Sequence, residues 1–321
     1  MKKSVFARSF AILLISCIFC SILSGCGSSS KSSSSEPPVY SPLRVLVPEA
    51  PGSDTLGSSP LTLDVSNITQ GYFAAQSDSA DLVTSLQITA PTGVLYSYFI
   101  EPGENAVIPF TEGDGDYTVV GYQQIQGDQY AALYSETLTV ELENEFLPFL
   151  YPNQYVNFSP DSEASKLALS MVSENTSDID ALKQIYNYVV NNLSYDYDKA
   201  ETVETGYLPD VDETLSTKTG ICFDYAALTT AMLRSCDIPC KLQIGYTGDI
   251  KHAWIDVYIR SKGWVTNAVS FNGDSWSLMD PTSIPAQTPM TVRQFRITSA
   301  MQITILYSSH DNGKRRPFYE T

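Results

Sequence analysis

The spacing of apolar residues changes along this chain, from a period of two to a period of three or four. In residues 43–145, short runs alternate between apolar and polar residues, and Gly, Pro, Asn and Asp separate the runs. The run "LTLDVSNI" places Leu61, Leu63 and Val65 on one face and polar residues on the other. This pattern predicts a sandwich of half-buried antiparallel strands, and we expect its topology to be immunoglobulin-like.

After residue 160 the apolar residues recur every three or four positions, which predicts amphipathic helices. A Ser-Asp pair at Ser177 and Asp178 caps the second of two such segments. The apolar positions are Ala164, Leu167, Ala168, Met171 and Val172 in the first segment, and Ile179, Leu182, Ile185, Tyr186 and Val189 in the second. No period follows from Ser194 to Gly220, so we expect a long loop there, either functional or mobile.

A third helix is expected after Gly220, with Cys222 in its first turn and a packing face formed by residues such as Phe223 and Ala226. The run "HAWIDVYI" then predicts a strand with an apolar back and with His252, Trp254, Asp256 and Tyr258 in front. The turn signal "RSKGW" folds the chain back antiparallel. We interpret "DSWSLMDPTS" as a neighbouring strand that ends at Asp280.

The N-terminus has the pattern of an export signal. Lys2, Lys3 and Arg8 precede an apolar run that ends in small residues and is too short to span a bilayer comfortably. The "LSGC" that closes the run resembles the lipobox of bacterial lipoproteins, which implies removal of residues 1–25 and lipidation of Cys26. The alternative is an ordinary cleaved signal with a chance cysteine. Residues 26–42 are rich in Ser and Pro and are expected to be a tether.

The negative net charge of the chain disfavours two classes of binding partner. The loss of Lys2, Lys3 and Arg8 from a segment without acidic residues takes the formal net charge from −17 to −20. Nucleic acid and anionic lipid are poor partners for such a chain, so we expect no nucleic-acid partner. No paired metal-ligand motif and no glycine-rich phosphate loop is present in the sequence, so we expect no metal and no cofactor.

Cys222 is the candidate nucleophile. At a helix N-terminus, unpaired N–H groups and the helix dipole favour the thiolate, although a cysteine among apolar residues is often only a buried hydrophobe. The chain has two histidines. His310 lies in a polar tail, whereas His252 opens the predicted strand and can serve as base and acid. Asp256 lies four residues from His252 along that strand and is too far away to orient its ring.

The cysteine count leaves one further question open. Cys17 and Cys20 lie in the predicted signal, and Cys26 is the predicted lipidation site. The remaining cysteines are Cys222, Cys236 and Cys240. Cys236 and Cys240 flank the predicted helix exit, where they either form a disulfide in an oxidising exterior or remain two buried thiols.

Three blocks in order, "GICFDYAALTTAMLRSCDIPCKLQIGY", "HAWIDVYI" and "WSLMDPTS", resemble the Cys, His and Asp blocks of the transglutaminase-like superfamily. Its core is related to papain-like cysteine proteases. The resemblance covers about residues 160–285 and implies an α+β fold in which a helix-borne cysteine packs on an antiparallel sheet. The organisation that we predict after residue 145 is therefore a linker at 146–160, a transglutaminase-like catalytic domain at 161–290 and a C-terminal extension at 291–321.

The resemblance also implies roles for individual residues. Cys222 becomes the nucleophile, His252 the general base and acid, and Asp280 the orienting carboxylate. The Cys222 backbone N–H is one donor of the oxyanion hole, and the sequence does not identify the second. In animal transglutaminases an upstream tryptophan is that donor, whereas all three tryptophans of this chain lie downstream of Cys222. Trp254, Trp276 and Tyr225 are candidate walls of the cleft, although buried aromatic residues in a sheet are common.

These observations predict a lipid-anchored enzyme on the extracytoplasmic face of a bacterial membrane. We expect it to form a thioester with glutamine or peptide amides of exported or cell-surface proteins, followed by acyl transfer or hydrolysis. One alternative is a cysteine peptidase of the same fold. The other is a surface binding or adhesion lipoprotein that uses the domain as an inactive scaffold.

Overall fold

The computed structural model describes residues 44–279, with gaps at 80–81, 104, 127–128, 205, 248–249 and 272–274. The predictions for the signal peptide, Cys26, the tether, Asp280 and the C-terminal extension therefore lie outside the described residues. Within the described ranges, no helix is long and apolar enough to cross a membrane.

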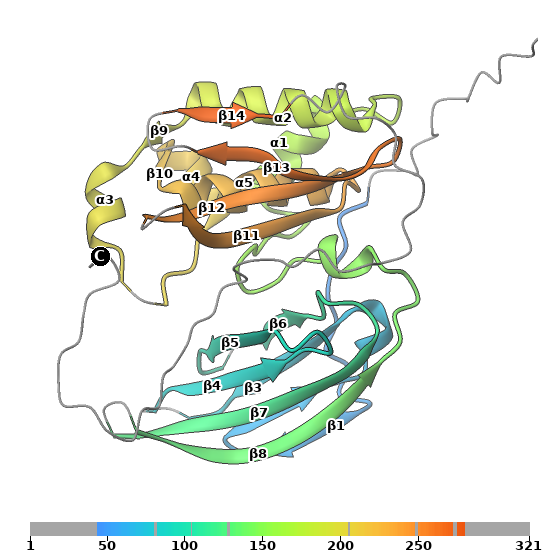
Figure 1. Ribbon diagram of the computed structural model, residues 1–321, viewed down its shortest axis with the longest axis vertical. Coiled ribbons are helices and arrows are strands. Elements are labelled where there is room, and N and C mark those ends of the chain that lie inside the picture. Colours follow the sequence, from blue (N-terminus) through green and yellow to red (C-terminus); the bar gives the residue numbers. More distant parts are fainter. Residues whose placement is uncertain are drawn as a thin grey trace, which may run out of the picture. The chain divides into compact units, whose positions relative to one another are not determined.

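Residues 55–140 form two four-stranded antiparallel sheets (Figure 1). The first sheet has the order β1-β2-β3-β6 and contains β1 (Thr55–Ser58), β2 (Leu61–Asp64), β3 (Tyr72–Ser77) and β6 (Asn105–Pro109). The second has the order β5-β4-β7-β8 and contains β5 (Leu95–Ile100), β4 (Thr84–Thr89), β7 (Gly115–Gln126) and β8 (Gln129–Val140). A short helix, η1 (Ile68–Gln70), precedes β3. Leu63 and Phe73 of one sheet share a core with Leu86 and Val119 of the other, so the two sheets form a sandwich.

Residues 163–279 form an α+β region around one buried helix (Figure 1). Its long helices are α1 (Glu163–Met171), α2 (Asp178–Asn192) and α5 (Cys222–Ser235). An antiparallel sheet of order β11-β12-β13-β14 consists of β11 (Cys240–Thr247), β12 (Ile250–Ile259), β13 (Gly263–Phe271) and β14 (Trp276–Leu278). Helix α5 packs against the strands β11 and β12 and against the helices α1, α2 and α4 (Val211–Thr217). The short helix η2 (Leu147–Phe149) lies between the sandwich and this region in the sequence.

The local sequence accounts for these elements. The Ser177 hydroxyl accepts a hydrogen bond from the Asp180 N–H and begins α2 as predicted. All residues of α5 except Phe223 are buried, which suits a helix built largely from small and apolar side chains. In β12, Ala253, Ile255, Val257 and Ile259 are buried against the core. The α+β class and the antiparallel sheets are therefore confirmed, and the immunoglobulin-like topology of the sandwich stays a prediction.

Two expectations were wrong. The stretch from Ser194 to Gly220 is not an unstructured loop. It contains β9 (Ser194–Tyr195), α3 (Tyr197–Thr202), α4 (Val211–Thr217) and β10 (Thr219–Gly220). These elements are too short to show a helical or strand period, although Asp196 and Asp210 cap the two helices. The strand "WSL" also does not neighbour β12, because β13 lies between β12 and β14.

Candidate active site

Helix α5 begins at Cys222, and a buried carboxylate fixes its first turn. The Asp224 carboxylate accepts a hydrogen bond of 2.8 Å from the Ile221 N–H and so caps the helix. Gly220 makes room for this carboxylate, because a Cβ at position 220 would lie 2.6 Å from the Asp224 Cβ. The glycine is therefore required by close packing and not by its backbone angles.

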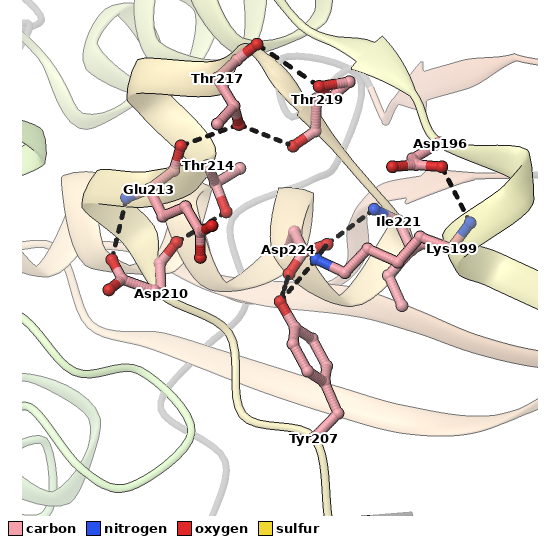
Figure 2. A network of polar contacts seen from close by, with 10 residues as sticks. All are labelled: Asp196, Lys199, Tyr207, Asp210, Glu213, Thr214, Thr217, Thr219, Ile221 and Asp224. Carbon is pink, nitrogen blue, oxygen red and sulfur yellow. Dashed lines mark hydrogen bonds and ion pairs between the residues drawn. The ribbon is translucent and has the colours of Figure 1, made fainter. Parts of the chain in front are cut away.

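A polar network around Asp224 connects the segment before α5 to the helix (Figure 2). Asp224 is fully buried, and its carboxylate also accepts hydrogen bonds from the Tyr207 hydroxyl and from the Lys199 ammonium at 2.8 Å. Lys199 belongs to α3, which begins where the Asp196 side chain accepts the Lys199 N–H at 2.8 Å. The ion pair with Lys199 thus joins α3 to the first turn of α5.

A two-residue parallel pairing brings Tyr195 next to the same turn. Strand β9 pairs with β10 in a register that places Tyr195 opposite Gly220. The Ser194 N–H donates to the Lys218 carbonyl at 2.8 Å, and the Asp196 N–H donates to the Gly220 carbonyl at 3.0 Å. Both strands are therefore tied together immediately before Cys222.

The Cys222 thiol lies in a buried environment that contains several hydrogen-bond donors. Cys222 is 9% exposed. Its sulfur accepts hydrogen bonds from the backbone N–H groups of Ala253 and Phe223 and from the Tyr195 hydroxyl. Burial raises the pKa of the thiol above its usual range, against these three hydrogen bonds, which lower it. The expectation that the helix end ionises the thiol is therefore not supported, because desolvation is the larger effect.

His252 precedes the residue whose N–H contacts the sulfur, so β12 brings it to the start of α5. The side chain is buried, and burial lowers its pKa below the usual range, which favours the neutral imidazole. Its Nδ1 atom is buried and forms no hydrogen bond with any residue in the described part of the chain. A neutral imidazole with an unoccupied ring nitrogen can accept a proton, which is what a thiol nucleophile requires.

The carboxylates near this strand have different positions. Asp256 lies opposite Lys241 in the β11–β12 register, whereas His252 lies opposite Gly245. The Asp256 carboxylate accepts hydrogen bonds from the Asn267 N–H at 2.8 Å and from the Gln243 side chain at 3.2 Å, so it is already engaged. Asp280, the predicted orienting carboxylate, follows β14 and lies outside the described residues.

The comparisons agree with this architecture. Residues 165–281 match the Transglutaminase-like superfamily, and this range contains α5, β12, the first two sequence blocks and the third block as far as Pro281. The described residues of this range have the transglutaminase-like fold. The match covers the α+β region and does not extend to the β-sandwich.

Two curated relatives share only part of their length with this chain. UPF0252 protein MJ1282 of Methanocaldococcus jannaschii is 40% identical over 62 residues, which are 18% of each chain. Uncharacterized protein YebA of Bacillus subtilis is 24% identical over 183 residues, covering 50% of this chain and 25% of YebA. The chain thus spans a quarter or less of the length of these relatives. The periplasmic domain of TgpA from Pseudomonas aeruginosa, solved with ethylmercury, is 14% identical with a TM-score of 0.31, covering 71% of this chain and 96% of that one.

Aromatic residues surround the first turns of α5 in the transglutaminase-like domain. The rings of Tyr225 and Trp276 stack with centroids 4.5 Å apart and an angle of 14° between their planes. The ring of Tyr195 lies 6.3 Å from that of Tyr225. Trp254 is half-buried and lies on the same strand as His252. The structure therefore brings Trp276 onto Tyr225 in the first turns of α5, and their role as cleft walls stays a prediction.

The other two cysteines of the transglutaminase-like domain are separate thiols. Cys236 and Cys240 are both free and buried, which is the second of the two alternatives from the sequence. Burial raises the pKa of each thiol to about 12. The Cys240 thiol donates to the Thr230 hydroxyl at 3.5 Å. No group of three or more potential metal ligands occurs among the residues that the structure describes.

Sequence reasoning missed four residues of this site: Tyr195, Lys199, Tyr207 and Asp224. Asp224 had a usable signal, because an acidic residue at the third helical position is typical of a capping box. The other three lie in the segment that showed no period, and they reach α5 only through tertiary contacts. No spacing rule finds such contacts in a single sequence.

The raised pKa of Cys222 predicts how its alkylation depends on pH. A raised pKa leaves less thiolate at any given pH, so the rate of carbamidomethylation by iodoacetamide should rise at higher pH in the folded chain than in the urea-unfolded chain. Mass spectrometry of the Cys222 peptide from pH 5 to pH 10 measures both profiles. Fast alkylation of the folded chain at pH 5 would contradict this expectation and indicate a thiolate–imidazolium pair at rest.

Proposed function

We propose that the chain is a cysteine enzyme that forms a thioester at Cys222 with amides of proteins or peptides. The observation that carries the proposal is the environment of one sulfur. The sulfur belongs to Cys222, the first residue of a buried helix, and it accepts hydrogen bonds from three donors. One of these donors is the N–H of Ala253, which follows the neutral His252 in β12. An inert buried cysteine needs neither the donors nor the histidine.

In the proposed reaction, the Cys222 sulfur attacks the amide carbonyl carbon while its proton passes to His252. One S–C bond forms, and the carbonyl π electrons become an oxyanion. The oxyanion then re-forms the carbonyl, the C–N bond breaks, and the leaving amine takes the proton from His252. Water or an amine, deprotonated by His252, then attacks the thioester carbonyl carbon. The C–S bond breaks, the carboxylic acid or new amide leaves, and the Cys222 sulfur takes the proton back from His252. In this proposal Asp280 orients the His252 ring, as the sequence resemblance implies.

The proposal includes a location. The charged start, apolar run and "LSGC" of the N-terminus support lipidation at Cys26 and attachment to the outer face of a bacterial membrane. The substrates are then amides of exported or cell-surface proteins. The fold itself is compatible with amine transfer and with hydrolysis, because the two reactions share the thioester.

The test uses the full chain and p-nitrophenyl acetate, an activated ester that acylates thiols. We expect an acetyl group on Cys222, identified by intact mass and peptide mapping, that forms faster in the folded chain than in the urea-unfolded chain. A thiol that is merely buried reacts more slowly when folded, so the opposite order would overturn the enzyme proposal. Cys222→Ala should remove the fast acylation, while Cys236 and Cys240 serve as internal controls.

A second experiment separates the reaction classes once acylation is established. Dimethylated casein and a biotinylated primary amine are offered together, and the products are analysed by mass spectrometry. Biotin on glutamine indicates acyl transfer, conversion of glutamine to glutamate indicates an amidase, and new chain termini indicate a peptidase. If the ester acylates Cys222 more slowly in the folded chain than in the unfolded chain, and casein stays unchanged, the result favours the alternative of an inactive scaffold.

A further inference from the structure

The Tyr195 hydroxyl is the one side-chain donor among the groups that hydrogen-bond to the Cys222 sulfur in the described part of the chain. The other two donors are the backbone N–H groups of Ala253 and Phe223. A backbone N–H is fixed by the strand or helix that contains it, whereas a phenolic O–H can rotate about its C–O bond. A phenolic O–H is a hydrogen-bond donor and can donate to an anion.

We propose that Tyr195 is the second oxyanion donor of this enzyme. The inference rests on the proposed thioester chemistry. When the Cys222 sulfur bonds to the carbonyl carbon, the negative charge develops on an oxygen attached to that same carbon. A hydroxyl that donates to the sulfur in the resting enzyme is therefore already close to the position of the oxyanion, and a small rotation transfers its hydrogen bond there.

The Cys222 backbone N–H complements this donor. Cys222 is the first residue of α5, so its N–H has no carbonyl within the helix to which it can donate. The two donors therefore come from different chain segments: the N–H from the start of α5 and the hydroxyl from β9. Both are held before substrate binds, which is the condition for electrostatic stabilisation of an oxyanion.

Several contacts hold Tyr195 in place. Its backbone lies in β9, opposite Gly220 of β10, and the following residue caps α3. Helix α3 is in turn joined to the first turn of α5 by the ion pair between Lys199 and Asp224 at 2.8 Å. The Tyr195 ring contacts the ring of Tyr197 edge-on, with centroids 4.9 Å apart. The position of the hydroxyl is thus set by backbone pairing, an ion pair and ring packing.

Tyr195→Phe tests the assignment, because it removes the hydroxyl and keeps the ring. We expect acylation of Cys222 by p-nitrophenyl acetate to slow by about 10²-fold, the loss typical of one oxyanion donor. Alkylation by iodoacetamide forms no oxyanion. It should slow by no more than about fivefold, the effect of one hydrogen bond to the thiolate. The ratio of the two rates therefore isolates the oxyanion.

Tyr197→Phe is the matched control, since it keeps the ring that packs against Tyr195 and removes only the hydroxyl of a residue that is 60% exposed. It should leave both rates unchanged. Equal slowing of acylation and alkylation in Tyr195→Phe, or no slowing of either, would overturn the role of Tyr195. If the wild-type folded chain is acylated more slowly than the unfolded chain, the proposed function fails instead. The two failures are thus distinguishable in one assay.

Discussion

Replacement of His252 by alanine is expected to slow acylation of Cys222 by about 10²–10⁴-fold, the range for loss of a general base. The thiol is the reason for so large an effect. Burial raises its pKa, so little thiolate is present at neutral pH and the proton has to leave during the attack. His252, the proposed base, has a lowered pKa that favours the neutral imidazole, and it precedes Ala253, whose N–H contacts the sulfur.

The pH profile adds a second readout to this experiment. The lowered pKa of His252 means that the imidazole is already neutral somewhat below its usual titration range, so wild-type acylation should reach its plateau before neutral pH. The alanine variant should instead gain rate only as the thiol ionises at high pH. His310→Ala is the matched control, because it removes the other histidine of the chain. Equal rates for His252→Ala and the wild type would exclude a base at this position.

Replacement of Asp224 by alanine is expected to lower the free energy of unfolding of the α+β region by about 2–4 kcal/mol, since it breaks a buried ion pair and removes a helix cap. This expected loss is smaller than for a fully buried ion pair, because the Lys199 side chain is 31% exposed. Asp224 accepts hydrogen bonds from Ile221, Lys199 and Tyr207, so all three lose their acceptor together. Tryptophan fluorescence in urea measures this region alone, because Trp254, Trp264 and Trp276 all lie in its sheet.

Two further variants show whether the ion pair is the cause. Lys199→Met combined with Asp224→Ala should cost less than the sum of the single changes, since the partners interact directly. Asp198→Ala changes an exposed acid in the first turn of α3 and should alter the free energy of unfolding by no more than about 0.5 kcal/mol. Strictly additive effects would show that Lys199 and Asp224 act independently.

The long elements were predictable because their burial follows one period for several turns. Of the positions that the spacing indicated, Ala164, Ala168, Val172, Leu182, Ile185 and Val189 are buried, and Leu167, Met171, Ile179 and Tyr186 are half-buried against the same core. In β12, Ala253, Ile255, Val257 and Ile259 alternate with residues of the opposite face. The same regularity placed Cys222 at a helix start and His252 on a strand. These two residues therefore came from local sequence, before any tertiary contact was known.

Irregular burial explains why the sequence did not predict β13. In β13 the buried residues are Val265, Ala268 and Val269, because the pairing with β12 shifts register between Ile255 and Val257. Asn267 within this shift has a φ of 52°, a left-handed conformation that interrupts the alternation of faces. A strand with such a defect has no period of two, and the chain after "RSKGW" was therefore assigned one strand too few.

The pairing of β9 with β10 also has an evolutionary consequence. The chain leaves this pairing after Tyr195, forms α3 and α4, and returns to it at Thr219, so the excursion begins and ends at the same place. The entropy of closing such a loop grows only slowly with its length. Insertions or deletions between α3 and α4 can therefore accumulate while Cys222 keeps its position. Proteins related to this chain can thus differ in this excursion while the start of α5 stays the same.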